Sequence, residues 1–172
     1  NPTIMLMSLA NAPTYDKVFA GLTIAPTIGF WRPQWRFQVT KQWYTTQTPQ
    51  GPLKLNNPMG TITWNNNLQL PWGILLDVDF LYKTKGDIQN GRFLKPSWRA
   101  DLSLQKSFLN DNLTLQLDAW NVLDSYKRSF IMYVSDRQTM QMDEHSTHCQ
   151  ARLTIRYKFN ASKSKYKGTG AG

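Results

Sequence analysis

The sequence predicts an all-β protein, an antiparallel transmembrane β-barrel with about eight strands present in 172 residues. Three observations lead to this fold class. Long segments alternate apolar and polar side chains with a period of two, as β-strands with two different faces do. Short and long connections alternate between these segments, and aromatic residues are abundant. The length suits one domain or part of a larger one.

The composition fits a membrane interface better than a soluble domain. Charged residues make up 18% of the chain and hydrophobic residues 41%, both below the averages of soluble domains. Aromatic residues make up 13%, including seven Trp, and such residues are enriched at membrane interfaces. No segment has the ~18–20 consecutive apolar residues of a transmembrane helix. Barrel strands escape that criterion because half of their residues are polar.

The first part of the chain predicts three strands. Residues 3–9 form a short apolar run that we interpret as a strand. Residues 18–31 alternate over 14 positions, although Pro26 donates no ladder hydrogen bond and therefore indicates a bulge. Residues 31–34 are predicted to form a tight turn, after which residues 35–44 alternate again and predict the third strand.

The middle of the chain predicts a loop and a hairpin. Residues 45–53 contain two Pro and one Gly, which predict a long loop. Residues 60–70 alternate with one exception, Asn66, a polar residue on the apolar face. Residues 71–73, Pro-Trp-Gly, predict a tight turn, and residues 74–82 return as the next strand.

The last part of the chain predicts the remaining strands. Residues 83–96 are predicted to form a second long loop, followed by a strand over residues 97–108. Residues 109–112 predict a tight turn, and residues 113–119 alternate as its partner strand. Residues 130–142 are interpreted as the same strand continued past a bulge. Residues 143–148 form the last predicted loop.

The closing segment, residues 147–159, shows the clearest alternation. One face carries Leu153, Ile155, Tyr157 and Phe159, and the other carries Thr154, Arg156 and Lys158. In a barrel wall the apolar set would face lipid and the polar set would face the lumen.

Charged side chains lie on the polar face of almost every predicted strand. A charge on the lipid face costs about 2–4 kcal/mol at the bilayer midplane, so these residues are predicted to face the lumen. They are Arg36, Asp77, Asp79, Arg99, Asp101, Asp118, Arg156 and Lys158.

Two features favour a barrel over a soluble sandwich. Residues 18–31, 60–70 and 97–108 hold their pattern for 14, 11 and 12 positions, whereas soluble strands typically run about 5–6 residues. The three tight turns also fall on one side of the predicted wall, as periplasmic turns of outer-membrane barrels do, and the long loops fall on the other.

The excess positive charge is concentrated near the end of the chain. The formal net charge is +9, and residues 150–172 contain six basic residues and no acidic ones. Such a segment can bind an anionic surface, but no nucleic-acid-binding motif is present, so nucleic acid is not an expected partner. We divide the chain into barrel strands over residues 1–160 and a basic, flexible periplasmic tail over residues 161–172.

The sequence shows no catalytic constellation, so neither an enzyme activity nor a cofactor is predicted. The single cysteine excludes an internal disulfide. One group of residues has metal-binding side chains: Asp143, Glu144, His145, His148 and Cys149. Their spacing matches no closed zinc site, and we interpret them as a polar extracellular loop without a metal. Asp77 and Asp79 are interpreted as lumen-lining residues and not as an acid–base pair.

Several short motifs occur in a recognisable order. They are Pro-Thr-Tyr-Asp at 13–16, Leu-Pro-Trp-Gly at 70–73, Lys-Ser-Phe-Leu at 106–109, Asn-Val-Leu-Asp at 121–124, the terminal Tyr157-x-Phe159 and the tail from Ser164. The last third of the chain thereby resembles the C-terminal barrel region of TonB-dependent outer-membrane receptors. The whole chain is similar to the "outer membrane protein beta-barrel" branch of that superfamily in Bacteroidetes. In many barrels the terminal Phe is the last residue, whereas 13 residues follow Phe159 here.

The resemblance implies a location in the bacterial outer membrane and a barrel of about 22 strands around a plug. This chain would be its C-terminal part, and the barrel would import a bound ligand with energy transmitted by TonB. The implied partners are outer-membrane lipid, the rest of the barrel and plug, TonB through an upstream region, and the barrel-assembly machinery during insertion. The chain begins at Asn1 without a signal segment, which favours a piece of a longer chain.

Two other functions also fit the alternation. Eight strands could close alone as a small structural or adhesin barrel, because eight strands leave an interior that side chains just fill. A soluble β-sandwich that serves as a binding module would also alternate. Upstream sequence encoding a plug favours the transporter, a signal peptide directly before Asn1 favours the small barrel, and recovery without detergent favours the sandwich.

A segment of a larger barrel would have two unpaired edges, which lipid does not tolerate. We therefore expect the chain to occur with the rest of the barrel or with a protein that pairs its edges. Ligand specificity would reside in the missing plug and in the extracellular loops at residues 11–16, 45–53, 83–96 and 143–148.

Overall fold

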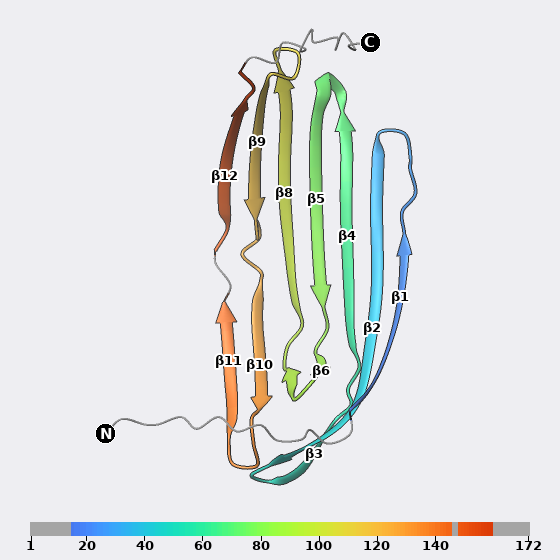
Figure 1. Ribbon diagram of the computed structural model, residues 1–172, viewed down its shortest axis with the longest axis vertical. Helices are drawn as coiled ribbons and strands as arrows, with labels where there is room; N and C mark the ends of the chain where they lie inside the picture. The colour runs from blue at the N-terminus through green and yellow to red at the C-terminus, as the bar shows by residue number, and fades with distance from the viewer. Residues whose placement is uncertain (1–14, 146–147, 160–172) are drawn as a thin grey trace, which may run out of the picture.

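The computed structural model describes residues 15–145 and 148–159. In this part of the chain, long strands lie side by side in one antiparallel sheet, in the order β1-β2-β4-β5-β8-β9-β12 (Figure 1). Their bounds are β1 (Asp16–Ile24), β2 (Trp31–Thr48), β4 (Met59–Leu70), β5 (Ile74–Lys83), β8 (Ser97–Phe108), β9 (Leu113–Trp120) and β12 (Gln150–Tyr157). The predicted all-β antiparallel architecture is confirmed. The predicted strand at residues 3–9 and the tail at residues 161–172 lie outside the described residues.

The sheet is open within the described residues. There, β1 pairs with β2 alone and β12 pairs with β9 alone. Few apolar side chains are buried in this part of the chain, namely Leu55, Tyr126 and Pro33. A β-sandwich needs a dry layer of side chains between two facing sheets, and no such layer exists among the described residues. These residues also do not close into a small barrel. Among them, no helix is long and apolar enough to span a membrane.

Tight turns join the strands at one end of the sheet (Figure 1). The 3₁₀ turn η1 (Pro71–Gly73) links β4 to β5, with Trp72 and Gly73 at φ values of 61° and 69°. Residues 109–111 link β8 to β9 and all have positive φ. The predicted turns at residues 71–73 and 109–112 are therefore confirmed.

The first turn lies earlier than the sequence predicts. Two hydrogen bonds between the backbones of Ile28 and Trp31, of 2.8 and 2.9 Å, close a two-residue turn in which Gly29 has a φ of 57°. The predicted turn at residues 31–34 is wrong because these residues begin β2. The predicted strand over residues 18–31 ends at Ile24, so Pro26 lies in the connection and not at a bulge. Pro33 is tolerated inside β2 because β1 ends opposite Trp35, so no strand needs a hydrogen bond from residue 33 on that side of β2.

Short strands extend the molecule beyond the opposite end of the sheet (Figure 1). A second sheet has the order β11-β10-β7-β6, and β3 pairs with the far part of β2. Their bounds are β3 (Gly51–Leu55), β6 (Gly86–Ile88), β7 (Gly91–Phe93), β10 (Lys127–Tyr133) and β11 (Thr139–His145).

These short strands correct four predictions. The predicted loop at residues 143–148 is wrong in its first half, because β11 continues to His145. Residues 45–53 are not a loop, because β2 continues to Thr48 and turns directly into β3. Residues 83–96 contain the β6–β7 hairpin. Residues 130–142 are not one strand, because Ser135 and Asp136 lie in a turn whose ends are joined by a hydrogen bond from the Val134 amide to the Gln138 carbonyl, of 2.9 Å. That turn reverses the chain, so that β10 and β11 pair with each other.

The register gives the main sheet one apolar face. One row across five strands is Ile24, Trp35, Trp64, Phe80 and Ala100. Because side chains alternate along a strand, the intervening residues form a second, polar face. Large apolar side chains such as Leu153 and Ile155 remain exposed, each at 64%. A sheet with one exposed apolar face and one polar face is what a barrel wall requires.

Candidate functional site

One row of polar side chains crosses six strands in register. Its members are Arg32, Asn67, Asp77, Ser103, Asp118 and Arg152. Asn67 Nδ2 donates to Asp77 Oδ1 at 2.6 Å, and Ser103 Oγ donates to Asp118 Oδ1 at 2.7 Å. Arg152 Nη2 donates to Asp118 Oδ2 at 2.9 Å. We call this set the polar row.

Asp118 is the most tightly held member of the polar row. Only 5% of the residue is exposed. Gln116 Nε2 donates to its Oδ1 at 2.8 Å, in addition to the bonds from Ser103 and Arg152. A carboxylate with several donors is stabilised in its charged form, so Asp118 can carry a negative charge on this face without a ligand.

A second row lies beside the first and consists of Gln34, Asn65, Asp79 and Asp101. Asp79 and Asp101 lie directly opposite each other, an arrangement that is unfavourable for two like charges. Each carboxylate has its own partner. Asn65 Nδ2 donates to Asp79 at 2.7 Å, and Arg99 Nε lies 2.9 Å from Asp101. Asp101 also accepts the Asn121 amide at 2.8 Å.

The structure brings half of the predicted lumen-facing residues together. Asp77, Asp79, Asp101 and Asp118 line one open hollow on the polar face, together with side chains of both rows. Arg99 adjoins the hollow through Asp101. The arrangement offers carboxylate and amide oxygens as well as guanidinium groups, so it can hydrogen-bond a polar solute.

Three predicted residues lie away from that hollow. Arg36 stands one row beyond Asp79, in line with Thr63, Leu81 and Arg99. Arg156 lies opposite Thr114, and the Lys158 amide donates to the Asn112 carbonyl at 2.8 Å, near the turn after β8. They belong to the polar face but form no common site with the four aspartates.

The closing strand has its apolar residues on one face. Leu153, Ile155 and Tyr157 lie opposite Leu117, Leu115 and Leu113 of β9. The Phe159 ring follows the strand and contacts the Tyr157 ring edge-on, with 4.7 Å between centroids. The other edge of β12 has no strand beside it among the described residues.

The Asn-Val-Leu-Asp segment forms a compact turn between β9 and β10. Asn121 and Asp124 have φ values of 50° and 48°. The Asp124 amide donates to the Asn121 carbonyl at 2.8 Å. Asn121 Oδ1 accepts the amides of Ser125 and Tyr126 at 3.1 and 3.2 Å. The motif therefore fixes the backbone position from which the Asp124 carboxylate extends.

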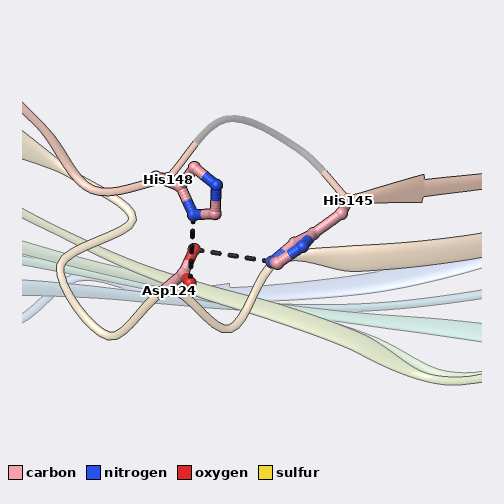
Figure 2. Close-up of side chains that lie close together, drawn as sticks. All are labelled: Asp124, His145 and His148. Atoms are coloured by element: carbon pink, nitrogen blue, oxygen red, sulfur yellow. Dashed lines mark hydrogen bonds and ion pairs between the residues drawn. The ribbon is translucent and has the colours of Figure 1, made fainter.

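Both histidines of the chain lie against that carboxylate (Figure 2). His145 Nε2 is 3.5 Å from Asp124 Oδ1, and His148 Nδ1 is 3.3 Å from Asp124 Oδ2. The two imidazole rings meet edge-on with 5.3 Å between centroids. This trio is the one cluster among the described residues with the side chains to hold a metal ion.

The other residues of the metal-like sequence cluster have different partners. Asp143 accepts Ser129 Oγ at 2.5 Å and Gln141 Nε2 at 2.9 Å. These hydrogen bonds, the first above all, lower the pKa of the Asp143 carboxyl below its ordinary value. Glu144 pairs with Arg128 across the β10–β11 ladder, and Cys149 is exposed. Asp124 was absent from the sequence cluster because it lies 24 residues before His148.

A protein-family model, the outer membrane protein beta-barrel family, matches residues 1–157. The chain belongs to this family. Comparison with the curated proteins and with the solved structures found no significant match.

Membership of the outer membrane protein beta-barrel family fixes the location. The protein is an outer-membrane barrel protein of a bacterium, as predicted. Antiparallel strands with one polar and one apolar face are what a barrel wall of this family requires.

Three residues of the polar row were not predicted from the sequence as site residues, namely Arg32, Asn67 and Arg152. Arg152 has the alternation of the closing strand, on the same face as Thr154 and Arg156, so its orientation could have been predicted. Arg32 was assigned to a turn, which hid its position in the row. The Asn67 side chain becomes relevant only through its cross-strand partner Asp77.

A buried polar junction joins the short strands to the wall and was also missed. Arg92 Nε and Nη2 donate to the two oxygens of Asp87 at 2.6 and 3.1 Å, and Asp87 is 1% exposed. The hydrogen bond to Asp87 raises the pKa of Arg92 above its ordinary value. The Asn57 amide donates to Asp87 Oδ2 at 2.8 Å.

Gln42 of β2 makes a second connection in the same region. Its Nε2 donates to the Gln89 carbonyl at 2.8 Å, and its Oε1 accepts the Gln89 amide at 2.7 Å. These contacts hold the β6–β7 hairpin against the wall.

Proposed function

We propose that the chain is the C-terminal barrel segment of a TonB-dependent transporter that imports a bound ligand across the outer membrane. The observation that carries the proposal is an open wall segment, with unpaired edges at β1 and β12 among the described residues, in a member of an outer-membrane barrel family. An open edge in lipid leaves backbone groups without partners and costs several kcal/mol for each. Further strands are therefore required to complete the wall.

The proposed partners follow from that requirement. The rest of the barrel pairs with the edges of β1 and β12, and a plug fills the lumen of the larger barrel. TonB acts through a region outside these residues, and the barrel-assembly machinery pairs the edges during insertion. In this arrangement Leu153, Ile155, Tyr157 and Phe159 contact outer-membrane lipid. We propose no enzyme activity, because transport requires binding and movement without covalent chemistry.

The polar face supports the transport function. The polar row and its neighbouring row place four aspartates and their donors along what would be the lumen wall. Because these side chains bind one another, the wall keeps its charges in place without a solute. Arg36, Arg156 and Lys158 extend the polar lining on either side of the hollow.

Energised uptake distinguishes a TonB-dependent transporter from a passive barrel. Cells that make the protein and cells that lack it are incubated in a chemically complex medium, and depletion of each compound is measured by mass spectrometry. We expect at least one compound to be depleted only by cells that make the protein, and a protonophore should abolish that depletion. Depletion that persists with the protonophore would contradict the proposal and indicate a passive barrel.

A further inference from the structure

Three separate segments converge where the barrel wall meets the short strands (Figure 2). Asp124 comes from the turn after β9, His145 is the last residue of β11, and His148 lies shortly before β12. The segments are held near one another because β9 pairs with β12, while β10 pairs with β11. The trio is therefore positioned by the two hairpin ladders as well as by its own contacts.

Two distances within the trio are close to those between neighbouring ligands of one metal ion. Zinc binds imidazole nitrogen and carboxylate oxygen at about 2.0–2.1 Å in tetrahedral geometry, which places two ligand atoms about 3.3–3.4 Å apart. His145 Nε2 lies 3.5 Å from Asp124 Oδ1 and His148 Nδ1 lies 3.3 Å from Asp124 Oδ2, so each imidazole approaches a different oxygen of the carboxylate. One ligand atom from each of the three residues can be chosen so that all lie within 4.8 Å of one another.

One oxygen of the carboxylate has no hydrogen bond of its own. Asp124 Oδ1 is inaccessible to solvent and accepts no hydrogen bond, although His145 Nε2 lies 3.5 Å away. A carboxylate oxygen removed from water without a donor is costly. The turn built by Asn121 fixes the backbone of Asp124 beside the two histidines. A cation between Asp124 and the imidazoles would satisfy this oxygen.

We propose that Asp124, His145 and His148 form a binding site for a divalent transition-metal ion of the zinc class. Two imidazoles and one carboxylate suit zinc and its neighbours, whereas calcium and magnesium take oxygen ligands. Three protein ligands leave at least one coordination position for water or for a donor atom of a solute. The side chains of His145 and His148 are 43% and 83% exposed, so an ion can reach the site from solvent.

The bound ion would tie the β9–β10 turn to the β11–β12 connection. It would thus fix the angle at which the β10–β11 hairpin leaves the barrel wall. Two charged groups lie beside the site on β10 and β11: Lys127 is opposite His145 in the ladder, and Glu144 is paired with Arg128. Neither Lys127 nor Glu144 is a proposed ligand. Substitution of Glu144 therefore serves as a control for Asp124→Asn, because it also removes a carboxylate near the site.

The test measures zinc binding to the protein in detergent micelles by competition with a chromophoric chelator. We expect one Zn²⁺ per chain, and Asp124→Asn, His145→Ala and His148→Ala should each weaken binding by at least about tenfold. Glu144→Gln and Cys149→Ser should bind as the wild type does. Absence of zinc binding, wild-type affinity in the three ligand variants, or loss of binding in Cys149→Ser would each overturn the site.

Imidazole NMR signals give a second readout that does not depend on affinity. Because the chain contains two histidines and both belong to the site, every imidazole resonance of the chain reports on it. Zinc should shift both sets of signals together, and calcium at the same concentration should shift neither. Signals that do not respond to zinc in a protein whose circular dichroism shows intact strands would contradict the proposal. Neither readout depends on transport, so the site can fail or stand independently of the proposed function.

Discussion

The indole Nε1 of Trp31 donates a hydrogen bond of 3.0 Å to the side-chain oxygen of Asn66. Asn66 is the polar exception on the apolar face of β4, and its amide nitrogen donates to the Val78 carbonyl at 3.1 Å. Both ends of the amide therefore have partners within the wall. This pairing explains how a polar side chain is accommodated on a face that we propose meets lipid, where unpaired polar groups are costly.

Removing only the hydrogen-bond donor should destabilise the protein more than removing both the donor and the acceptor. Trp31→Phe leaves the Asn66 oxygen without a donor and should reduce the free energy of unfolding by about 1–3 kcal/mol. Asn66→Leu combined with Trp31→Phe removes both polar groups and should cost less than Trp31→Phe alone. Urea unfolding in detergent, followed by Trp fluorescence, measures both changes. Equal destabilisation by the single and double variants would argue against the hydrogen bond as the cause.

Adjacent residues of the closing strand test which face meets lipid. Leu153→Arg places a charge on the apolar face and should cost about 2–4 kcal/mol if that residue lies near the bilayer midplane. Thr154→Arg places the same charge on the polar face and should cost far less. Unfolding in lipid vesicles compares the two. If both substitutions have the same effect, the assignment of the faces is wrong.

The pair between Asp87 and Arg92 should be essential for the β6–β7 hairpin. Arg92→Ala leaves the buried Asp87 carboxylate without its guanidinium, a change that costs about 3–5 kcal/mol for a buried pair. We expect faster hydrogen exchange at the Asn57 amide, which donates to Asp87 Oδ2. Exchange at the Arg156 amide, in a distant strand, serves as the control and should not change. Unchanged exchange at Asn57 would show that Asp87 is held by other contacts.

The β10–β11 hairpin should lose stability in acid. The Asp143 carboxyl has a folded-state pKa below the ordinary value of 3.8, because Ser129 and Gln141 donate to its charged form. A lowered pKa means that the stabilisation is fully present above the unfolded-state pKa and is lost as the pH falls through the folded-state pKa.

Carbon-13 NMR of the Asp143 carboxyl gives the midpoint directly. We expect the midpoint to lie below 3.8 in the wild type and to rise in Ser129→Ala, because the first of the two donors is removed. Gln141→Ala should produce a smaller rise. A wild-type midpoint at or above 3.8 would contradict the predicted stabilisation.

The alternation of apolar and polar residues was sufficient to predict the strands of the barrel wall, but it did not show where every strand ends. The strands β4, β5 and β8 agree closely with residues 60–70, 74–82 and 97–108, because the alternation there continues in one phase with few exceptions, such as Asn66. Around residues 25–31 the alternation continues by coincidence through the turn, since Ile28 and Phe30 keep the apolar phase. The deciding feature, the left-handed backbone of Gly29, is a local conformation and leaves no trace in the periodicity.

The sequence could predict the face on which a site residue lies, because that depends on the pattern of a single strand. It could not predict the partners of that residue on other strands. The alternation placed Asp77 and Asp79 on the polar face, but their partners Asn67 and Asn65 depend on the register between β4 and β5. The contact of Asp124 with both histidines depends on the β9–β12 and β10–β11 pairings, which bring distant segments together. Neither register nor long-range pairing can be read from the composition of a single segment.

The continuous ladder of β2 and β3 should affect how readily external proteases cleave the protein on intact cells. β2 has 18 residues, a length of roughly 60 Å at about 3.3 Å per residue, whereas a barrel strand needs about 9–11 residues to cross the bilayer. Its far part therefore continues outside the hydrocarbon layer, where it is paired with β3 and anchored by Gln42. Proteases cut most readily at exposed loop tips. Residues 44–48 pair with residues 51–55 in a hairpin, which leaves a two-residue turn as its tip. If this end faces the outside of the cell, as predicted, we expect the segment to be exposed and yet to resist proteolytic shaving of live bacteria.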